Sequence, residues 1–309
     1  MRARRRFDKP RTRWNGGLGE GPDLLRYLLR RVAVAVPTLL AVVTAAFFMM
    51  RAAPGNPYDT GRRLPPEIEA AVKRQMHLDE PVLVQYGRYL ADVARGDLGP
   101  SLKYRDKRVW DFIREGFPKS AILGLAALLL GGVAGVGLGL LAAVRHNRSA
   151  DYAASSLAIL GICIPTFVTA PLLVLVFGSL LGWLPSGGWA VAGRVELLGW
   201  TLELPNLRNL VLPVVVLALP QVAVISRLTR AGAIEALRSN HVRMARTKGL
   251  DETHILRRHV LRPALIPLVS YLGPAVAGLI TGSLVVERIF QLRGLGRAFV
   301  AGALQRDYT

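Results

Sequence analysis

Residues 243–263 read R-M-A-R-T-K-G-L-D-E-T-H-I-L-R-R-H-V-L-R-P and lie between two long apolar runs that contain no Asp, Glu, Lys or Arg. These runs cover residues 209–226 and 263–286. Each reaches the roughly 18 to 20 residues that an α-helix needs to cross a hydrocarbon layer about 30 Å thick. The pattern predicts a basic segment outside the bilayer that is held at both ends by membrane-spanning helices.

Three further uncharged runs cover residues 32–50, 120–144 and 152–193. Five such runs in 309 residues indicate an all-α polytopic membrane protein rather than a soluble core with one or two buried helices. The first run is too long for a secretory signal peptide and lacks an A-x-A-like cleavage site, so we expect an uncleaved anchor. We assign the five spans as follows: 28–50, 119–144, 152–182, 209–226 and 263–286.

The distribution of basic residues predicts the orientation of the spans. With a cytoplasmic N-terminus, the inner segments are residues 1–31, 145–151 and 227–262. These segments carry 21 Lys and Arg against 7 Asp and Glu, whereas the outer segments carry 19 against 14. The long first outer loop weighs little in the positive-inside rule. We therefore predict that the N-terminus is cytoplasmic.

Two segments outside the spans have a distinct composition. Residues 1–27 are rich in Arg, which predicts a basic, disordered cytoplasmic tail attracted to anionic lipid. Residues 51–118 are long enough to form a small helical extracytoplasmic subdomain. Its helices are expected to begin at Pro65, at Pro81 and after Asp106.

Glycine and proline residues interrupt the spans. Gly131, Gly135 and Gly139 have the small-xxx-small spacing that lets a neighbouring helix approach closely. Pro165 and Pro171 predict a bend in the third span. Such breaks often surround a transport pathway, and a kink satisfied by neighbouring helices is an equally good interpretation.

Cysteine and tryptophan residues have ordinary structural interpretations. The single cysteine, Cys163, lies inside a span, so the chain cannot build a disulfide or a Cys-based metal site, and we expect a small core residue. Trp183, Trp189 and Trp200 cluster in an outer loop. Because indole rings prefer the lipid headgroup region, we expect them to be membrane anchors.

The basic segment predicts a helix-turn-helix with a defined turn. The first helix is expected from about Ile234 to Lys248. Gly249 suits the left-handed position after a helix, with Leu250 as the apolar contact of the turn. Asp251 can then cap the second helix.

Ala245 and Gly249 are one helical turn apart and are expected to form a low surface against which a partner protein packs. Arg243, Arg246 and Lys248 would surround it. DNA binding is disfavoured, because a recognition helix must enter a major groove and both ends of this element are tied to the membrane. The segment is therefore predicted to dock a cytoplasmic protein.

The sequence contains no motif for chemistry of its own. It has no G-x-x-x-x-G-K-[ST] loop, so ATP-driven work would need a separate subunit. It has no H-E-x-x-H or G-x-S-x-G motif, and its histidines are scattered, so no catalytic, cofactor-binding or metal-binding residue is predicted. No Asp, Glu, Lys, Arg or His lies inside the five uncharged runs, which argues against coupling to an ion gradient. The five histidines are His77, His146, His241, His254 and His259.

The sequence A-R-T-K-G-L at 245–250, followed by R-H-V-L-R-P at 258–263, resembles the EAA loop of ABC importer permeases of the dipeptide/oligopeptide/nickel family. The B-type permease of an oligopeptide importer is the most similar form. Four further motifs carry the resemblance: F-F-M-M-R-A-A-P-G-N-P at 47–57, G-D-L-G-P-S at 96–101, L-P-S-G-G-W at 184–189 and T-G-S-L-V-V-E at 281–287.

The resemblance implies a type I importer fold in a bacterial cytoplasmic membrane. Its partners would be a second homologous permease, two P-loop ATPases that bind ATP and Mg²⁺, and an extracytoplasmic peptide-binding protein, with membrane lipid around them and no nucleic acid. The chain would be a transport subunit and not an enzyme. The EAA loop, within residues 227–262, would couple the ATPases to the spans through these residues: Arg243, Ala245, Arg246, Thr247, Lys248, Gly249 and Leu250.

The sequence departs from the family pattern in two places. Arg293 precedes Gly294, where the family usually has a proline. Residues 287–309 are expected to form an extracytoplasmic segment leading to a sixth span beyond the sequence. Other substrates of the family, dipeptides or nickel, remain alternatives to oligopeptides. A stand-alone secondary transporter or a membrane-embedded enzyme is less favoured. The residues of the substrate pathway are not predicted.

Overall fold

The computed structural model describes residues 24–52, 79–104, 106–197, 200–281, 283–305 and 307. The chain forms two compact units, residues 1–55 and 56–309. Residues 1–23 of the expected basic tail (1–27) and the helix expected to begin at Pro65 lie outside the described residues, whereas residues 24–27 belong to a helix.

The first unit contains one described helix, α1 (Leu24–Ala52), with Pro37 in its interior. Large apolar side chains are exposed along its length, including Leu25, Val34 and Leu39. Since lipid chains can cover such a surface, α1 suits the predicted first span.

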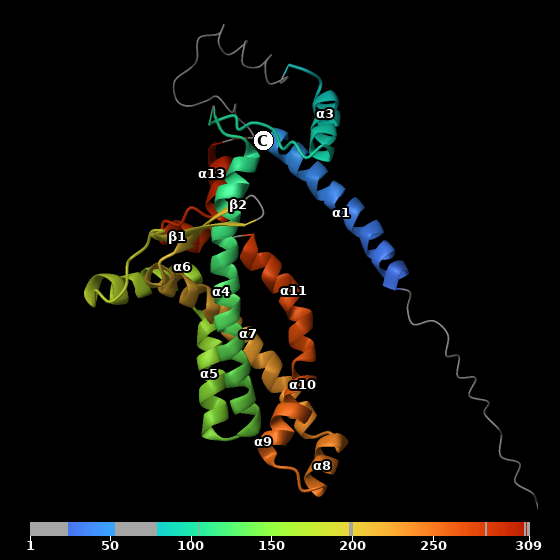
Figure 1. Cartoon of the computed structure of the whole chain (residues 1–309), viewed down its shortest axis with the longest axis vertical. Helices are drawn as coiled ribbons and strands as arrows, with labels where there is room; N and C mark the ends of the chain where they lie inside the picture. Colours follow the sequence, from blue (N-terminus) through green and yellow to red (C-terminus); the bar gives the residue numbers. More distant parts are fainter. Residues whose placement is uncertain are drawn as a thin grey trace, which may run out of the picture. The chain divides into compact units, whose positions relative to one another are not determined.

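The second unit is mainly helical, and its described residues are drawn from cyan (α3) to red in Figure 1. Its elements are, in chain order: α3 (Val82–Ala94), α4 (Val109–Val144), α5 (Ser149–Cys163), α6 (Thr166–Leu173), η1 (Val174–Leu180), β1 (Val191–Leu197), β2 (Trp200–Pro205), α7 (Leu207–Leu237), α8 (Asn240–Thr247), α9 (Glu252–Ile255), η2 (Leu256–Val260), α10 (Leu261–Ala264), α11 (Ile266–Ile280), α12 (Leu284–Ile289) and α13 (Leu295–Gln305). In Figure 1, β1, β2 and α13 lie toward one end of α4, the hairpin end, and α8 and α9 lie toward the other, the loop end.

Helices α4 and α7 pack closely along the predicted glycine stripe. A Cβ atom placed on Gly131 would lie 2.6 Å from the Cβ of Gln221, and one placed on Gly135 would lie 2.8 Å from the Cβ of Ile225. At Gly139 the added atom would meet the backbone of α7. The predicted close approach is confirmed, because no larger residue fits at these positions without moving α7.

Among the described residues, four helices are long and apolar enough to cross a membrane: Leu25–Ala52, Val109–Val144, Leu207–Leu237 and Ile266–Ile289. The third predicted span is not one straight helix. It consists of Ser149–Cys163 and Thr166–Leu180, which are bent by 100° relative to each other. The break predicted at Pro165 is confirmed, since this residue has an extended backbone conformation and immediately precedes α6. If the pair is one span, the number of candidate spans is five.

The expectation of a separate helix after Asp106 is wrong. That helix is the beginning of α4, which continues through Pro118 to Val144. The backbone NH of Arg108 donates to Oδ2 of Asp111 at 2.8 Å, so Asp111 and not Asp106 stabilises the start. A helix of 36 residues is about 54 Å long and therefore extends well beyond the hydrocarbon layer. The helix expected after Pro81 is confirmed as α3.

Two other helix boundaries differ from the prediction. The helix expected from Ile234 to Lys248 is divided, because α7 ends at Leu237 and α8 begins at Asn240. Ser239 between them has an extended backbone, and its hydroxyl donates to the carbonyl of Ala236 at 2.5 Å. The fifth span is also interrupted, since α11 ends at Ile280 and a further helix, α12, follows it.

The expectation of an all-α fold is wrong at the loop before α7, which contains an antiparallel β-hairpin. Arg194 pairs with Glu203, and Glu196 pairs with Thr201 in the register of β1 and β2. Apolar and polar residues alternate along β2 and along β1 from Arg194 onward, which is the period of a strand with one solvated face. No strand was predicted in this segment, for which only the tryptophans had been interpreted.

Those tryptophans and the cysteine lie in different surroundings. Trp183 is 63% exposed, as a membrane anchor would be. Trp189 Nε1 donates to the carbonyl of Glu203, and the ring of Trp200 lies 6.2 Å from that of Trp110, so both also stabilise the hairpin end. Cys163 is exposed at the end of α5, and the expectation that it is a core residue is wrong.

Candidate functional site

The turn between α8 and α9 has the geometry predicted from its sequence. Gly249 has φ 75°, in the left-handed region that glycine adopts without strain. The NH of Leu250 donates to the carbonyl of Ala245 at 3.3 Å, and the NH of Gly249 donates to that of Arg246 at 3.0 Å. These two bonds form a Schellman motif. Oδ2 of Asp251 accepts from the NH of Thr253 at 2.9 Å, so the predicted cap of α9 is confirmed.

Helix α8 is fixed to α7 and α10 by a set of small and branched apolar residues, the loop-end cluster. Its buried members are Ala143, Ala233, Ala236, Val242, Ala245, Ile255, Val260 and Ala264. Val242 and Ile255 have no exposed area. Gly232 lies so close to α10 that an added Cβ would be 3.0 Å from the Cα of Ala264. The close packing leaves α8 little room to move independently of the loop-end cluster.

The structure corrects the expected role of Ala245. Its side chain is only 5% exposed and belongs to the loop-end cluster, so it cannot form a surface for a partner. Gly249 is exposed, and a Cβ atom there would meet nothing within 4 Å. The expectation that Ala245 and Gly249 together form a low surface is thus wrong for Ala245. Its side chain packs on the inner side of α8 and supports the turn between α8 and α9 from there.

The other predicted site residues lie together on the exposed side of α8 and its turn. These are Arg243, Arg246, Thr247, Lys248, Gly249 and Leu250. Met244 shares this face and is 59% exposed, and Leu250 is 40% exposed. Met244 was not predicted as a site residue; the i, i+3 spacing of the apolar Val242 and Ala245, which are buried, leaves it on the opposite, outer face. We call these seven residues the α8 face.

One arginine of the α8 face is already paired within the chain. Arg246 Nε donates to Oε1 of Glu252 at 2.6 Å, and its second nitrogen donates to Oε2 at 3.2 Å. This hydrogen-bonded pair lowers the pKa of Glu252 and raises the pKa of Arg246. Hydrogen bonds from the side chain and NH of Thr253 lower the pKa of Asp251. The charge left for a partner on this face is therefore positive and comes from Arg243 and Lys248.

Three histidines meet beside the α8 face. The ring of His259 lies 6.4 Å from that of His241 and 6.1 Å from that of His254. Among the described residues, no group of three or more His, Cys, Asp or Glu side chains could hold a metal ion. The sequence had placed these three histidines in one loop without indicating that they meet.

A buried charge pair that was not predicted from the sequence joins the first turn of α5 to α7. Asp151 is 2% exposed and accepts from Nε and Nη2 of Arg230, each at 2.7 Å. It also accepts from the NH of Asn147 at 2.9 Å, and the ring of His146 lies beside it. This bidentate geometry is the strongest form of an arginine–carboxylate pair. The pair fixes α5 to the same part of α7 that continues into the loop end.

A second buried carboxylate lies at the hairpin end. Glu287 is 1% exposed, and its Oε2 accepts from the NH of Arg297 at 2.9 Å, in the first turn of α13. Its Oε1 accepts from the hydroxyl of Ser120, which itself accepts from the NH of Leu295 at 2.8 Å. Glu287 is the last residue of the T-G-S-L-V-V-E motif, so the motif supplies the cap of α13 from another helix. The local geometry around Arg293 is thereby held without the usual proline.

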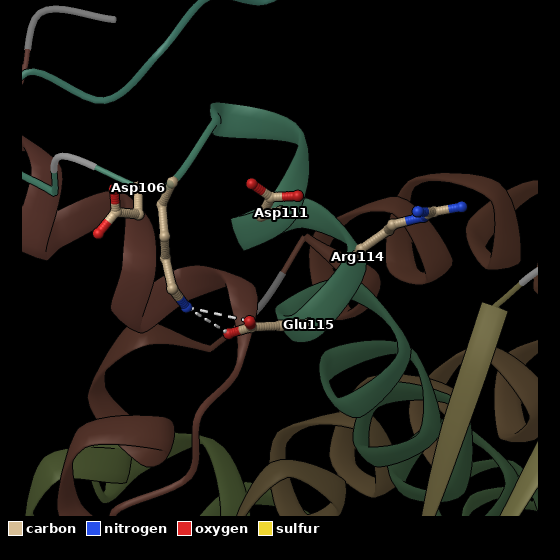
Figure 2. Close-up of a pocket in the computed structure, with 5 residues that line it drawn as sticks. Asp106, Asp111, Arg114 and Glu115 are labelled. Atoms are coloured by element: carbon tan, nitrogen blue, oxygen red, sulfur yellow. Dashed lines mark hydrogen bonds and ion pairs between the residues drawn. The ribbon is translucent and has the colours of Figure 1, made fainter.

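An open hollow of about 340 Å³ lies at the start of α4, at the hairpin end. Figure 2 shows the charged residues that line it: Asp106, Lys107, Asp111, Arg114 and Glu115. The ammonium group of Lys107 lies 3.0 Å from Oε1 of Glu115, as the dashed lines in Figure 2 mark. Because acidic and basic groups alternate here, the hollow has no single charge sign that would select a ligand.

Sequence comparison places the chain in one family. Residues 135–309 match the model of the family described as binding-protein-dependent transport system inner membrane component, and residues 24–124 match its N-terminal domain. The oligopeptide transport system permease protein OppB of Escherichia coli (strain K12) is 46% identical over 286 residues, which are 93% of this chain and 89% of that protein. The dipeptide transport system permease protein DppB of Bacillus subtilis (strain 168) is 37% identical over 285 residues, 92% of this chain and 88% of that protein.

A chain of a crystallised amino acid ABC transporter with histidines is 18% identical and covers 64% of this chain and 80% of its own length, with a TM-score of 0.43. The family match and the identity to curated relatives confirm the resemblance drawn from the A-R-T-K-G-L motif. The chain therefore belongs to the binding-protein-dependent transport system inner membrane components, the permeases of ABC importers.

Proposed function

We propose that this chain is the permease subunit of an ATP-driven importer of oligopeptides in the bacterial cytoplasmic membrane. The substrate follows from the relatives named for oligopeptide transport, which are 45–47% identical over 93% of the chain. The dipeptide permease of Bacillus subtilis, at 37%, supports dipeptides as the second candidate. ATP and Mg²⁺ would be bound by two partner ATPases, because the sequence has no P-loop.

The α8 face is the proposed contact with one of these ATPases. The observation that carries this assignment is that an exposed basic face lies on a helix whose other side is locked into the loop-end cluster. Met244 and Leu250 provide apolar contact area, and Arg243 and Lys248 provide positive charge. The loop end would then be cytoplasmic and the hairpin end extracytoplasmic, as the positive-inside rule predicts.

The proposed coupling is a rigid-body movement. ATP-driven closure of the ATPase pair would displace α8, and the loop-end cluster would pass the displacement to α7 and α10. The Asp151–Arg230 pair would carry α5 with α7. The second permease would move in the same way, so that the pathway between them opens alternately to each side.

A charge reversal on the α8 face tests the proposal. The complete importer, with both permeases, both ATPases and the peptide-binding protein, is assembled in lipid vesicles with Arg243→Glu in this chain. Arg243 is exposed and has no ion-pair partner among the described residues, so the fold should be kept. We expect loss of the ATPase stimulation by peptide-loaded binding protein.

Arg208→Glu is the matched control. It makes the same charge change at an exposed arginine at the opposite end of α7. Stimulation equal to wild type with Arg243→Glu, or an equal loss with both variants, would contradict the assignment of the α8 face. Uptake of a tripeptide that does not depend on ATP would contradict the proposed function itself.

A further inference from the structure

A polar pair joins two helices within their predicted spans. The hydroxyl of Tyr271 on α11 donates to Oε1 of Gln221 on α7 at 2.7 Å. Gln221 is near the middle of the 31-residue α7, and the Cβ of Gln221 lies against Gly131 of α4. Both polar side chains are partly buried. Three helices that are remote in sequence thus meet at a pair of hydrogen-bonding groups.

The pair leaves hydrogen-bonding capacity unused. The amide NH₂ of Gln221 has no hydrogen-bond partner among the described residues. It is not among the fully buried side-chain atoms that lack a partner in the described part of the chain. The amide therefore reaches an open face of the helix group. Facing lipid with two free donors would be costly, since hydrocarbon offers no acceptor.

The open face beside Tyr271 differs from the lipid-facing surfaces. On α11 the exposed residues near Tyr271 are mostly small, and they are Ser270, Gly273, Pro274, Ala277 and Gly278; Ile266 and Val269, nearer the start of the helix, are exposed as well. An added Cβ at Gly273 or Gly278 would meet nothing within 4 Å. On α5, by contrast, the exposed side chains are large, such as Leu157 and Leu160. A face with free donors among small residues leaves room for a polar chain rather than for lipid.

We propose that the Gln221 amide, oriented by Tyr271, binds the backbone of the peptide during its passage across the membrane, by donating hydrogen bonds to peptide carbonyl groups. This inference rests on the proposed function. A neutral amide suits this role, because every peptide offers backbone carbonyls and an uncharged group does not select among side chains. The neighbouring small residues allow side chains of different size to pass.

The test uses the complete importer in lipid vesicles, with Gln221→Leu or Tyr271→Phe in this chain. Leu is one carbon shorter than Gln and has no hydrogen-bonding groups, and Phe removes only the hydroxyl that orients the amide. Thr169→Val is the matched control, because it deletes a hydroxyl on α6 that bonds to the carbonyl of Pro165. ATP-dependent uptake of labelled tri-alanine and ATPase stimulation by loaded binding protein are measured on the same vesicles.

We expect Gln221→Leu to lower the uptake of tri-alanine roughly threefold to tenfold, the effect of one or two lost neutral hydrogen bonds. Tyr271→Phe should lower it less, and Thr169→Val should leave it unchanged. ATPase stimulation should stay at the wild-type level, so that fewer peptides are carried per ATP. The loss should be the same factor for tripeptides with Lys or Glu at the middle position, because the bond is to the backbone.

Three results would overturn the inference. The first is unchanged uptake of tri-alanine in Gln221→Leu. The second is a parallel fall of uptake and ATPase stimulation together with a lower thermal unfolding temperature. The third is a loss of uptake whose size depends on the side chain of the peptide. The second result would make the pair a bond between helices only. Failure of the wild-type importer to take up tri-alanine with ATP would instead contradict the proposed function, so the two failures are distinguishable.

Discussion

The hydroxyl of Ser120 donates a hydrogen bond to Oε1 of Glu287 at 2.7 Å and thereby joins α4 to α12. Both residues are buried, at 1% exposure each. The other oxygen of Glu287 caps α13, so one carboxylate connects three helices at the hairpin end. An added Cβ at Gly294 would fall on this carboxyl group, which explains why glycine follows Arg293.

Glu287→Ala should therefore destabilise the chain more than Glu287→Gln. Alanine leaves the Ser120 hydroxyl and the Arg297 NH without an acceptor, and each unpaired buried group costs about 1–3 kcal/mol. Glutamine keeps one acceptor oxygen. Thermal unfolding of the purified chain in mild detergent measures the difference, and equal unfolding temperatures for the two variants would refute the capping role.

Removing one partner of the Asp151–Arg230 pair should lower the free energy of unfolding more than removing both partners. Arg230→Leu leaves a carboxylate that is 2% exposed without its cation, which costs roughly 3–5 kcal/mol for a buried pair. Asp151→Ala should cost less, since the Arg230 side chain is 31% exposed and can reach water. The double variant should be more stable than Arg230→Leu alone. A denaturant titration of the four proteins tests this order, and additive losses would count against a direct pair.

Gly249→Val should impair coupling, whereas Gly249→Asn should retain most of it. The positive φ of Gly249 strains a β-branched residue, and asparagine tolerates this conformation better than other side chains. ATPase stimulation by loaded binding protein in the complete importer is the measurement. Gly132→Ala serves as the control, because an added Cβ there meets nothing within 4 Å and Gly132 lies inside a helix. Equal activity of the Val and Asn variants would show that the turn geometry is not required.

The hairpin should lose stability in acid through Glu203. Lys119 lies 3.0 Å from Oε2 of Glu203, and the hydrogen bond from Lys119 lowers the pKa of that carboxyl below its usual 4.5. A depressed folded-state pKa stabilises the fold above the unfolded pKa, and this contribution is lost as pH falls through the folded value. In wild type, the unfolding temperature should therefore decrease once the pH is lowered below about 4.5. Lys119→Met should lower it at pH 7 and flatten this acid dependence; an unchanged slope would exclude the pair as its cause.

Features set by local sequence were predictable. Gly249 and Asp251 specify a turn and a cap through their own backbone and side-chain preferences, and the structure has both. Pro165 breaks the third span because it lacks an NH and fixes φ. The Gly131–Gly139 stripe predicted close helix packing, although the sequence did not name α7 as the partner. The uncharged runs predicted the membrane helices because their length and polarity must match the bilayer.

The tertiary structure decided which residues meet across the chain. Ala245 has the same local pattern whether a partner or the chain itself covers it, and its place in the loop-end cluster buries it here. In the sequence, Glu287 and Asp151 are charged residues next to the ends of predicted spans. Their partners Ser120 and Arg230 lie 167 and 79 residues away, so the local sequence does not indicate either pair. Local propensity and hydropathy act within a few residues, whereas burial and hydrogen bonding depend on which distant segments the fold brings together.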